Sequence, residues 1–340
     1  MTLNLGLRIS LFGTYRDKQH FAFNFDPNHY VKGQTVTNPD GTVTGLTANG
    51  LPPSVTNLPN GIVQCGVTAG VPVGCMKGHL FNPAPRIGFA WDPKGDGKWA
   101  VRGGYGIFFE HTNGNEANTE SLENSPPLAT TVQQIGITGG YLGIGSGGGL
   151  GGSQLPLSVN AVQTKAVWPY VQQFHVDLEH EVIRNTVARI SYVGSKGTHL
   201  TRVSDFNQIA PLPSSLNPYK AATGTTPGEA IGPNDCTTLT TPSGVAITGQ
   251  ALLNLNVACG NVNADFARTA FPGYSNIAHL QDAASSTYNG MEVGVRRSVG
   301  GLELNFAYTY SHSIDNSSSR GDGDLVNALS PSSNRASSTL

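Results

Sequence analysis

The sequence contains few charged residues and no long apolar run. Asp, Glu, Lys and Arg together make up 12% of the 340 residues, whereas they make up about 25% of typical soluble proteins. No stretch of the chain approaches the ~18 consecutive apolar residues that a membrane-spanning helix requires. These two absences exclude a helical membrane protein, and they leave the apolar residues to be collected on one face of β-strands.

The signatures of nucleic-acid binding and of catalysis are also absent. The formal net charge is −2, so we expect no nucleic-acid partner. The sequence has no Gly-x-Ser-x-Gly motif and no catalytic arrangement of Cys and His. His175, Asp177 and Glu179 share one face of an expected strand, where neighbouring side chains rarely converge on one metal ion. We therefore predict a protein that is not an enzyme and has no cofactor or metal site.

The two ends of the chain lack the features of a complete exported protein. Met1 leads directly into an alternating segment, without the basic and apolar regions of a signal peptide. The last segment, 311–340, is rich in Ser, Asn and Asp and contains no closing strand. Its tripeptide Arg320-Gly321-Asp322 is similar to an integrin-binding motif, but we interpret so short a match as a solvated loop. We expect the chain to be a fragment of a longer protein.

Seven segments alternate between apolar and polar residues with a period of two. In the first, Leu3, Leu5 and Leu7 are separated by polar residues or Gly. Successive side chains of a strand point to opposite faces, so each segment has one apolar and one polar face. Strands are therefore expected near residues 3–11, 86–91, 99–109, 171–179, 186–193, 288–296 and 302–310.

The connections between these strands are alternately long and short. Short turns follow the second, fourth and sixth strands, and the last of them contains Gly300-Gly301. The long connections are residues 12–85, 110–169, 194–287 and 311–340. This alternation is typical of bacterial outer-membrane barrels, whose short turns are periplasmic and whose long loops are extracellular.

This alternation of long and short connections predicts an all-β fold, namely a portion of a transmembrane antiparallel β-barrel that occupies residues 1–340. The portion is expected to be incomplete, because about seven strands do not close a single-chain barrel, which has an even number of strands. No plug domain is expected within these residues. The predicted location is the bacterial outer membrane, with lipid as a partner.

The two faces of the predicted wall differ in their residues. The lipid-facing band is expected to contain Leu3, Leu5, Leu7, Ile9, Ile87, Phe89, Val101, Ile107, Val176, Ile190, Val293, Val295, Leu304 and Phe306. Aromatic residues at the strand ends, typical of membrane girdles, are Trp91, Trp99, Phe109, Tyr170, Tyr192, Tyr308 and Tyr310. The opposite, lumen-facing surface is expected to contain Arg8, Arg102, His175, Asp177, Arg189, Glu292 and Glu303.

Two hairpins allow a prediction of register. A turn near Ile183 would place Asp177 opposite Arg189. The same register would match three apolar pairs, namely Phe174 with Tyr192, Val176 with Ile190 and Leu178 with Ala188. For the last hairpin two registers remain open. A turn on Val299-Gly300 pairs Arg296 with Glu303, whereas a turn on Gly300-Gly301 pairs Arg296 with Asn305.

The four cysteines fall into two local pairs. Cys65 and Cys75 lie in the first long connection, and Cys236 and Cys259 lie in the third. Local pairs within long loops of an exported protein indicate disulfides that restrain those loops. We predict the disulfides Cys65–Cys75 and Cys236–Cys259.

Several of these segments resemble a known family. The run Asn-Pro-Ala-Pro-Arg-Ile-Gly-Phe-Ala-Trp-Asp-Pro at residues 82–93 is similar to a strand of TonB-dependent transporters of the Oar-like type. The other similar segments are Val101–Phe109, Gln172–Leu200, Ser286–Met291 and Tyr308–Asp315. The resemblance implies a 22-stranded outer-membrane barrel with an N-terminal plug, driven through the TonB system.

The leading functional hypothesis is therefore the barrel portion of a TonB-dependent outer-membrane transporter or receptor. Its ligand would be a large nutrient such as a glycan, a peptide or a metal chelate, and TonB would act only through N-terminal parts that this sequence lacks. One alternative is a passive outer-membrane pore or adhesin, which the long loops and Arg320-Gly321-Asp322 would favour. Another is a secreted all-β protein that acts on carbohydrate.

Overall fold

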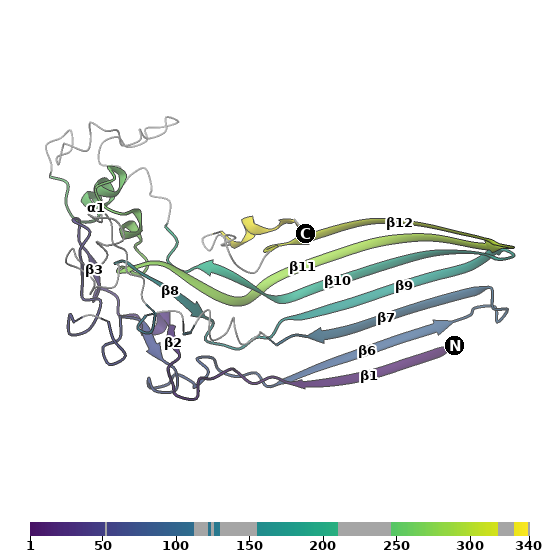
Figure 1. Cartoon of the computed structure of the whole chain (residues 1–340), viewed down its shortest axis with the longest axis horizontal. Helices are drawn as coiled ribbons and strands as arrows, with labels where there is room; N and C mark the ends of the chain where they lie inside the picture. Colours follow the sequence, from purple (N-terminus) through teal and green to yellow (C-terminus); the bar gives the residue numbers. More distant parts are fainter. Residues whose placement is uncertain are drawn as a thin grey trace, which may run out of the picture.

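The fold is that of a computed structural model that describes residues 1–51, 53–111, 122–123, 126–129, 155–209, 246–318 and 330–338. Its main feature is one long antiparallel sheet with the strand order β1-β6-β7-β9-β10-β11-β12-β13 (Figure 1). The strands of this path are β1 (Thr2–Leu11), β6 (Phe81–Trp91), β7 (Trp99–Phe109), β9 (Tyr170–Ile183), β10 (Thr186–Asp205), β11 (Tyr274–Val299), β12 (Leu302–Asp315) and β13 (Ala336–Ser337). The sheet is open, with β1 at one edge.

Three tight turns gather at one end of the sheet, at the right of Figure 1. In the β6–β7 turn, the Asp92 carboxylate accepts hydrogen bonds from the backbone N–H groups of Lys94, Gly95 and Gly97. The β9–β10 turn contains Asn185, with a φ of 64°. Gly300, with a φ of 62°, begins the β11–β12 turn. Asn and Gly accept a positive φ more readily than other residues, and thus these positions favour tight reversals.

The strands extend beyond their expected limits at the other end of the sheet. The prediction that residues 194–287 form one loop is wrong, because β10 continues to Asp205 and β11 begins at Tyr274. The two strands remain paired from Gly194 opposite Asn289 to Asp205 opposite Ala278, with register shifts around Leu200. These extensions mix polar residues with Gly, Ala and a few apolar residues, without a clear alternation. The period-two pattern ends where the apolar face ends, although the backbone ladder continues.

The other long connections also contain regular structure. Residues 12–85 include β2 (Phe23–Phe25), β3 (Val36–Thr37), β4 (Val43–Thr44), β5 (Ile62–Gln64) and the short 3-10 helix η1 (Pro27–His29). Elsewhere the connections contain β8 (Leu157–Val162), α1 (Gly249–Ala258), η6 (Ala264–Ala267) and η7 (Pro331–Asn334). We use the name cap for the described residues 12–80, 155–169, 200–209 and 246–284. The cap lies at the end of the sheet opposite the tight turns (Figure 1).

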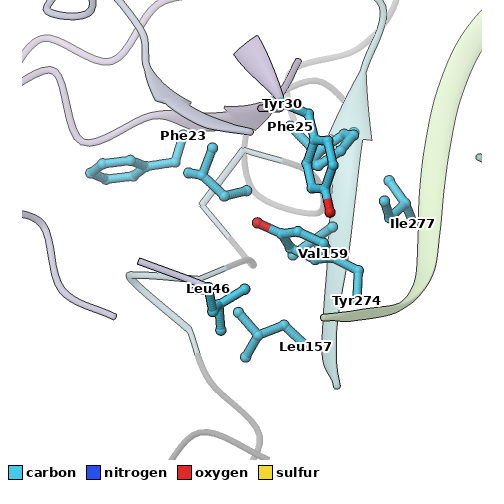
Figure 2. Close-up of a cluster of buried hydrophobic side chains, with 10 residues drawn as sticks. Phe23, Phe25, Tyr30, Leu46, Leu157, Val159, Tyr274 and Ile277 are labelled. Atoms are coloured by element: carbon cyan, nitrogen blue, oxygen red, sulfur yellow. The ribbon is translucent and has the colours of Figure 1, made fainter. Parts of the chain in front are cut away.

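The cap has a hydrophobic core that draws on three connections far apart in the sequence. Phe23 and Phe25 of β2, Leu157 and Val159 of β8, and Tyr274 of β11 are each at most 2% exposed (Figure 2). β8 pairs in parallel with the first residues of β11 and closes one side of this core.

Aromatic rings and two buried hydroxyls fix the arrangement of this core. The Phe25 ring contacts Phe271 and Tyr274 edge-on, at centroid distances of 5.0 and 5.2 Å. The Tyr274 hydroxyl donates to the Asn60 carbonyl at 2.6 Å. The Tyr30 hydroxyl donates to the Pro272 carbonyl at 3.1 Å. Edge-on aromatic pairs add to the stability gained from burial alone, and the satisfied hydroxyls avoid the cost of burying an unpaired polar group.

A second cluster contains a disulfide. Cys65 and Cys75 are bonded to each other, and they pack with Met76 and Trp168. The Trp168 indole N–H donates to the His79 carbonyl at 2.6 Å. The other predicted disulfide remains a prediction, because Cys236 lies outside the described residues.

One buried amide holds the end of β10 to the segment that precedes β11. The Asn207 side chain is fully buried, and its Nδ2 donates to the carbonyls of Phe271, Tyr274 and Ser275. Its Oδ1 accepts from the Phe271 N–H at 2.9 Å. The neighbouring Asp205 binds Arg268 at 2.6 Å. A single side chain therefore satisfies four backbone groups of Phe271 and of the first residues of β11.

We predict that Asn207→Ala destabilises the cap by about 3 kcal/mol, because it leaves several buried backbone groups without a partner. Hydrogen–deuterium exchange of the protein in detergent micelles should show lost protection at Phe271 and Tyr274. The control is Asn57→Ala, which removes an exposed side chain that donates to the Leu51 carbonyl. Equal protection in both variants would contradict the role of Asn207.

We also predict that the double variant Cys65→Ser, Cys75→Ser loses about 3 kcal/mol of cap stability, because the disulfide restricts the unfolded chain across a separation of 10 residues. Limited proteolysis should then cut the cap between residues 12 and 80 faster. The wild-type protein unfolded and refolded in reductant should behave like the variant, and reductant should not change the variant. A variant as resistant as the oxidised wild-type protein would show that the bond does not restrain this segment.

Candidate functional site

The register of the main sheet separates its residues into an apolar and a polar face. Leu5 of β1 pairs with Ile87 of β6, which pairs with Tyr105 of β7. The same face continues through β9, β10, β11 and β12, because paired residues share a face. All the residues of the expected lipid-facing band lie on this face, as do the aromatic residues expected at its ends.

The apolar face is exposed in the described structure. Leu5 is 72% exposed, Leu7 66% and Phe306 62%, whereas comparable residues of a soluble protein would be covered. The buried apolar residues instead lie in the cap. Large exposed apolar surfaces mark sites of contact with a membrane or another protein.

The opposite face carries the predicted polar residues. By register, one face contains all seven of them, namely Arg8, Arg102, His175, Asp177, Arg189, Glu292 and Glu303. Ion pairs join most of these residues across neighbouring strands. The pairs are Arg102–Glu179 at 2.9 Å, Arg189–Glu292 at 3.3 Å, Arg296–Glu303 at 2.9 Å and His175–Asp177, along one strand, at 3.6 Å.

The predicted pairing of Asp177 with Arg189 is wrong. Arg189 lies opposite Glu179, and Asp177 lies opposite Ser191. The turn centres on Arg184 and Asn185, with a register shift just after it, and not near Ile183. The pairing therefore moves by two residues, which leaves every side chain on its predicted face.

The three apolar pairs predicted for the same hairpin change with the register. Phe174 lies opposite Gly194, not Tyr192, and its ring covers the place that a Cβ at position 194 would occupy. Gly194 thereby accommodates a large ring on the neighbouring strand. Sequence alternation alone does not distinguish these two registers, since both keep the apolar residues together.

The last hairpin follows one of the two open registers. Val299 pairs with Leu302, so the turn is Gly300-Gly301 and Arg296 lies opposite Asn305. Its guanidinium nevertheless contacts Glu303 diagonally. Diagonal neighbours on one face remain within reach of long side chains, which explains why the ion pair forms in a register that does not place the two residues opposite each other.

Sequence reasoning missed a polar pocket in the cap. Its volume is about 510 Å³, and its walls come from three segments, namely residues 24–29, 63–79 and 164–166. The basic residues that line it are His29, Lys77, His79 and Lys165, and the acidic one is Asp26. No local pattern indicates this pocket, because Lys77 and Lys165 are brought together only by the packing of the first two long connections.

A buried histidine lies between β8 and the extension of β10. The His279 ring stacks on Phe206 at a centroid distance of 3.7 Å and is 7% exposed. The pKa of His279 is lowered to about 3, chiefly by burial and also by the positive charge of Arg202, while a hydrogen bond with the Val162 backbone acts in the opposite direction. His279 lies 20 residues before the end of β11 at Val299. Because only ~9–11 residues of a strand cross a bilayer, His279 lies outside the membrane-spanning part of β11.

Other kinds of site are absent from the described part of the chain. No three His, Cys, Asp or Glu side chains there are grouped to hold a metal ion. None of the described helices is long and apolar enough to cross a membrane. The tripeptide Arg320-Gly321-Asp322 lies outside the described residues.

Comparison with known proteins identifies the type of fold. A family model described as "Outer membrane beta barrel domain" matches residues 1–340. Among curated proteins no match is found.

Two solved structures are similar to the chain. The outer membrane transporter YddB from Escherichia coli has a TM-score of 0.36 and 11% identity over 70% of this chain. The siderophore receptor PirA from Pseudomonas aeruginosa has a TM-score of 0.29 and 12% identity over 69% of this chain. The match covers 21% of the first protein and 30% of the second.

We predict that acid weakens the cap through His279. The unfolded histidine takes up a proton near pH 6.5, whereas the folded one stays neutral until about pH 3. The unfolded state therefore binds more protons between these values, and stability falls as the pH decreases from about 6.5 towards 3. Protection against hydrogen exchange in β8 and in residues 274–280, corrected for intrinsic rates, should decrease in this range.

The matched variants for this experiment are His279→Phe, which keeps a ring on Phe206 but does not titrate, and His312→Phe, which replaces an exposed histidine. For each protein, the protection at pH 5 is divided by that at pH 7.5. This ratio should be higher in His279→Phe than in the wild-type protein, and it should be the same in His312→Phe as in the wild type. An unchanged acid sensitivity in His279→Phe would assign the effect to other groups.

Proposed function

The chain belongs to the outer membrane beta barrel domain family, and from this premise we propose that it forms part of the wall of an active transporter for large nutrients. In this proposal the apolar face contacts lipid, the polar face lines the lumen, the tight turns are periplasmic and the cap is extracellular. Energy reaches the transporter through the TonB system, by way of parts outside this chain. The nutrient is a glycan, a peptide or a metal chelate.

The observation that carries this proposal is the exposed apolar face of a sheet that is paired through its full width. In the wall, β6, β7, β9, β10 and β11 each have a neighbouring strand on both sides. A wall inside hydrocarbon requires this pairing, because no water is present to bind free N–H and C=O groups. The side chains on that face are apolar between aromatic ends, as in barrels that cross a membrane. The opposite face carries paired charges, which suit an aqueous lumen.

Two further features favour an active transporter over a passive pore. The segments that resemble TonB-dependent transporters fall on β6, β7, β9, β10, β11 and β12, which is most of the wall. Gly6 of β1 and Gly88 of β6 lie on the polar face, where a Cβ would have no neighbour closer than 3.6 Å. Glycines leave room for the close approach of another backbone, as a plug inside the lumen requires.

The alternatives are less well supported. A secreted all-β protein would cover its apolar face with a second sheet, whereas no described sheet covers it here. The adhesin hypothesis depended on long loops and on Arg320-Gly321-Asp322. The described loops instead pack into a cap with its own core, and the tripeptide lies outside the described residues.

We predict that single cysteines will show the orientation of the wall in intact cells. With the Cys65–Cys75 bond left in place and the protein without an added cysteine as the background control, Thr68→Cys in the cap should react with a membrane-impermeant maleimide. Asp96→Cys in the β6–β7 turn should react only after the outer membrane is opened. Leu5→Cys on the apolar face should be protected in both conditions, because it faces lipid, and Asn4→Cys on the opposite face is its matched control.

The reverse pattern, with the turn labelled from outside, would overturn the orientation. Labelling of all positions in a soluble fraction would overturn the membrane location itself. The energy requirement is tested separately, by uptake of labelled glycan and peptide mixtures by native cells with and without a proton uncoupler. Uptake that continues undiminished in the uncoupler would favour a passive pore.

A further inference from the structure

The polar pocket of the cap is the strongest unassigned feature of the chain. Its volume of about 510 Å³ lies within the ~300–1,000 Å³ typical of sites for small molecules. None of its lining residues is among the seven polar residues expected to line the lumen. It is therefore distinct from the expected lumen lining.

Two lysines are neighbours at this pocket. Lys77 and Lys165 form an isolated backbone bridge, in which the Lys77 N–H donates to the Thr164 carbonyl and the Ala166 N–H donates to the Lys77 carbonyl, both at 2.9 Å. Both lysines line the pocket. Neither is joined to a carboxylate within 4.0 Å in the part of the chain that the structure describes. Two like charges on adjacent backbones repel each other, and an anion between them would relieve the repulsion.

The acidic residue of the pocket already has partners. Asp26 is 8% exposed, and its Oδ1 accepts hydrogen bonds from the backbone and side-chain nitrogens of Asn28, both at 2.9 Å. Its Oδ2 contacts the His29 Nδ1 at 2.9 Å. Asp26 thus orders the wall of the pocket around η1 and is not directed at the lysines. The lining contains two lysines and two histidines against this one engaged carboxylate, in a chain whose net charge is −2.

The walls of the pocket are held rigidly. Asn24 is 1% exposed, and its side chain both donates to the Val162 carbonyl and accepts from the Val162 N–H, each at 2.9 Å. This pair fixes β2 to the end of β8, three residues before Lys165. On the opposite wall, the Cys65–Cys75 bond closes the segment that contains Gly70 and Pro72. A rigid site loses little entropy when it binds a ligand.

We propose that this pocket binds the oxyanion of a small acidic ligand, with Lys77 and Lys165 as its two charged donors. The ligand is a carboxylate, as in an acidic sugar, or a phosphate ester, since both present oxygens that accept from ammonium groups. The inference rests on the proposed function in one respect, namely that the cap faces the outside medium. It then narrows the nutrient class to acidic compounds.

The test uses three probes that share one sugar ring, namely glucuronate, glucose 6-phosphate and glucose. Binding to the whole protein in detergent micelles is measured by isothermal titration calorimetry at low salt. Glucuronate or glucose 6-phosphate should bind while glucose does not, and the affinity should decrease as salt is added. Preference for one of the two anions identifies whether the natural group is a carboxylate or a phosphate.

Lys77→Gln and Lys165→Gln should each lower the affinity about tenfold, because each removes a charged donor from the anion. The matched control is Lys32→Gln, which neutralises an exposed lysine of the cap that does not line the pocket. Both pocket lysines are exposed, so their replacement should leave the fold intact. Retained protection of the cap in hydrogen exchange checks this.

Equal binding of glucose and glucuronate would overturn the proposal, as would an equal effect of Lys32→Gln. No binding of any probe at millimolar concentration would also overturn it. These outcomes do not depend on membrane orientation or energy supply, because the calorimetry uses isolated protein. A failure of the cysteine-labelling experiment, with anion binding intact, would instead refute the transporter and leave the pocket standing.

Discussion

The unbroken antiparallel ladder is the constraint on which the rest of the structure depends. In hydrocarbon, a backbone N–H or C=O without a partner costs several kcal/mol, so the wall must pair each strand with its neighbours. Pairing fixes the direction of every side chain, since residues alternate between the two faces. The register that places Leu5 beside Ile87 therefore also places Arg102 beside Asp177 on the other side. One geometric rule thus creates both the lipid surface and the charged surface.

Hydrophobic burial stabilises the cap of this protein and not its wall. The apolar residues of the wall remain exposed and need lipid, whereas those of the cap bury one another. The extensions of β10 and β11 connect the two regions, because they carry the ladder past the apolar band and supply Tyr274 and Ile277 to the cap core. The cap is consequently anchored to the strands themselves and not to flexible connections. This anchoring gives the polar pocket fixed walls.

Charge is distributed unevenly between the two regions. On the wall, the arginines at 102, 189 and 296 each contact a glutamate. Exposed pairs of this kind contribute at most about 1 kcal/mol each, so their main effect is to balance the charge of this polar face. In the cap pocket, Lys77 and Lys165 lie together without such a partner among the described residues. These three wall arginines thus already have a carboxylate partner, whereas the two pocket lysines are free to act as the charged donors of the proposed site.

The sequence by itself determined the strands of the wall, their two faces and the tight turns. The alternation around Leu3, Leu5 and Leu7 predicts strands and faces, and Gly300-Gly301 predicts a reversal, because these depend on residues close together in the chain. The tertiary structure decided what the alternation leaves open. Registers that differ by two residues keep the same faces, so only the turn at Arg184-Asn185 and the packing of Phe174 on Gly194 select Glu179 as the neighbour of Arg189. The cap and its pocket were decided in the same way, since Lys77 and Lys165 are separated by 88 positions and become neighbours only when distant segments pack together.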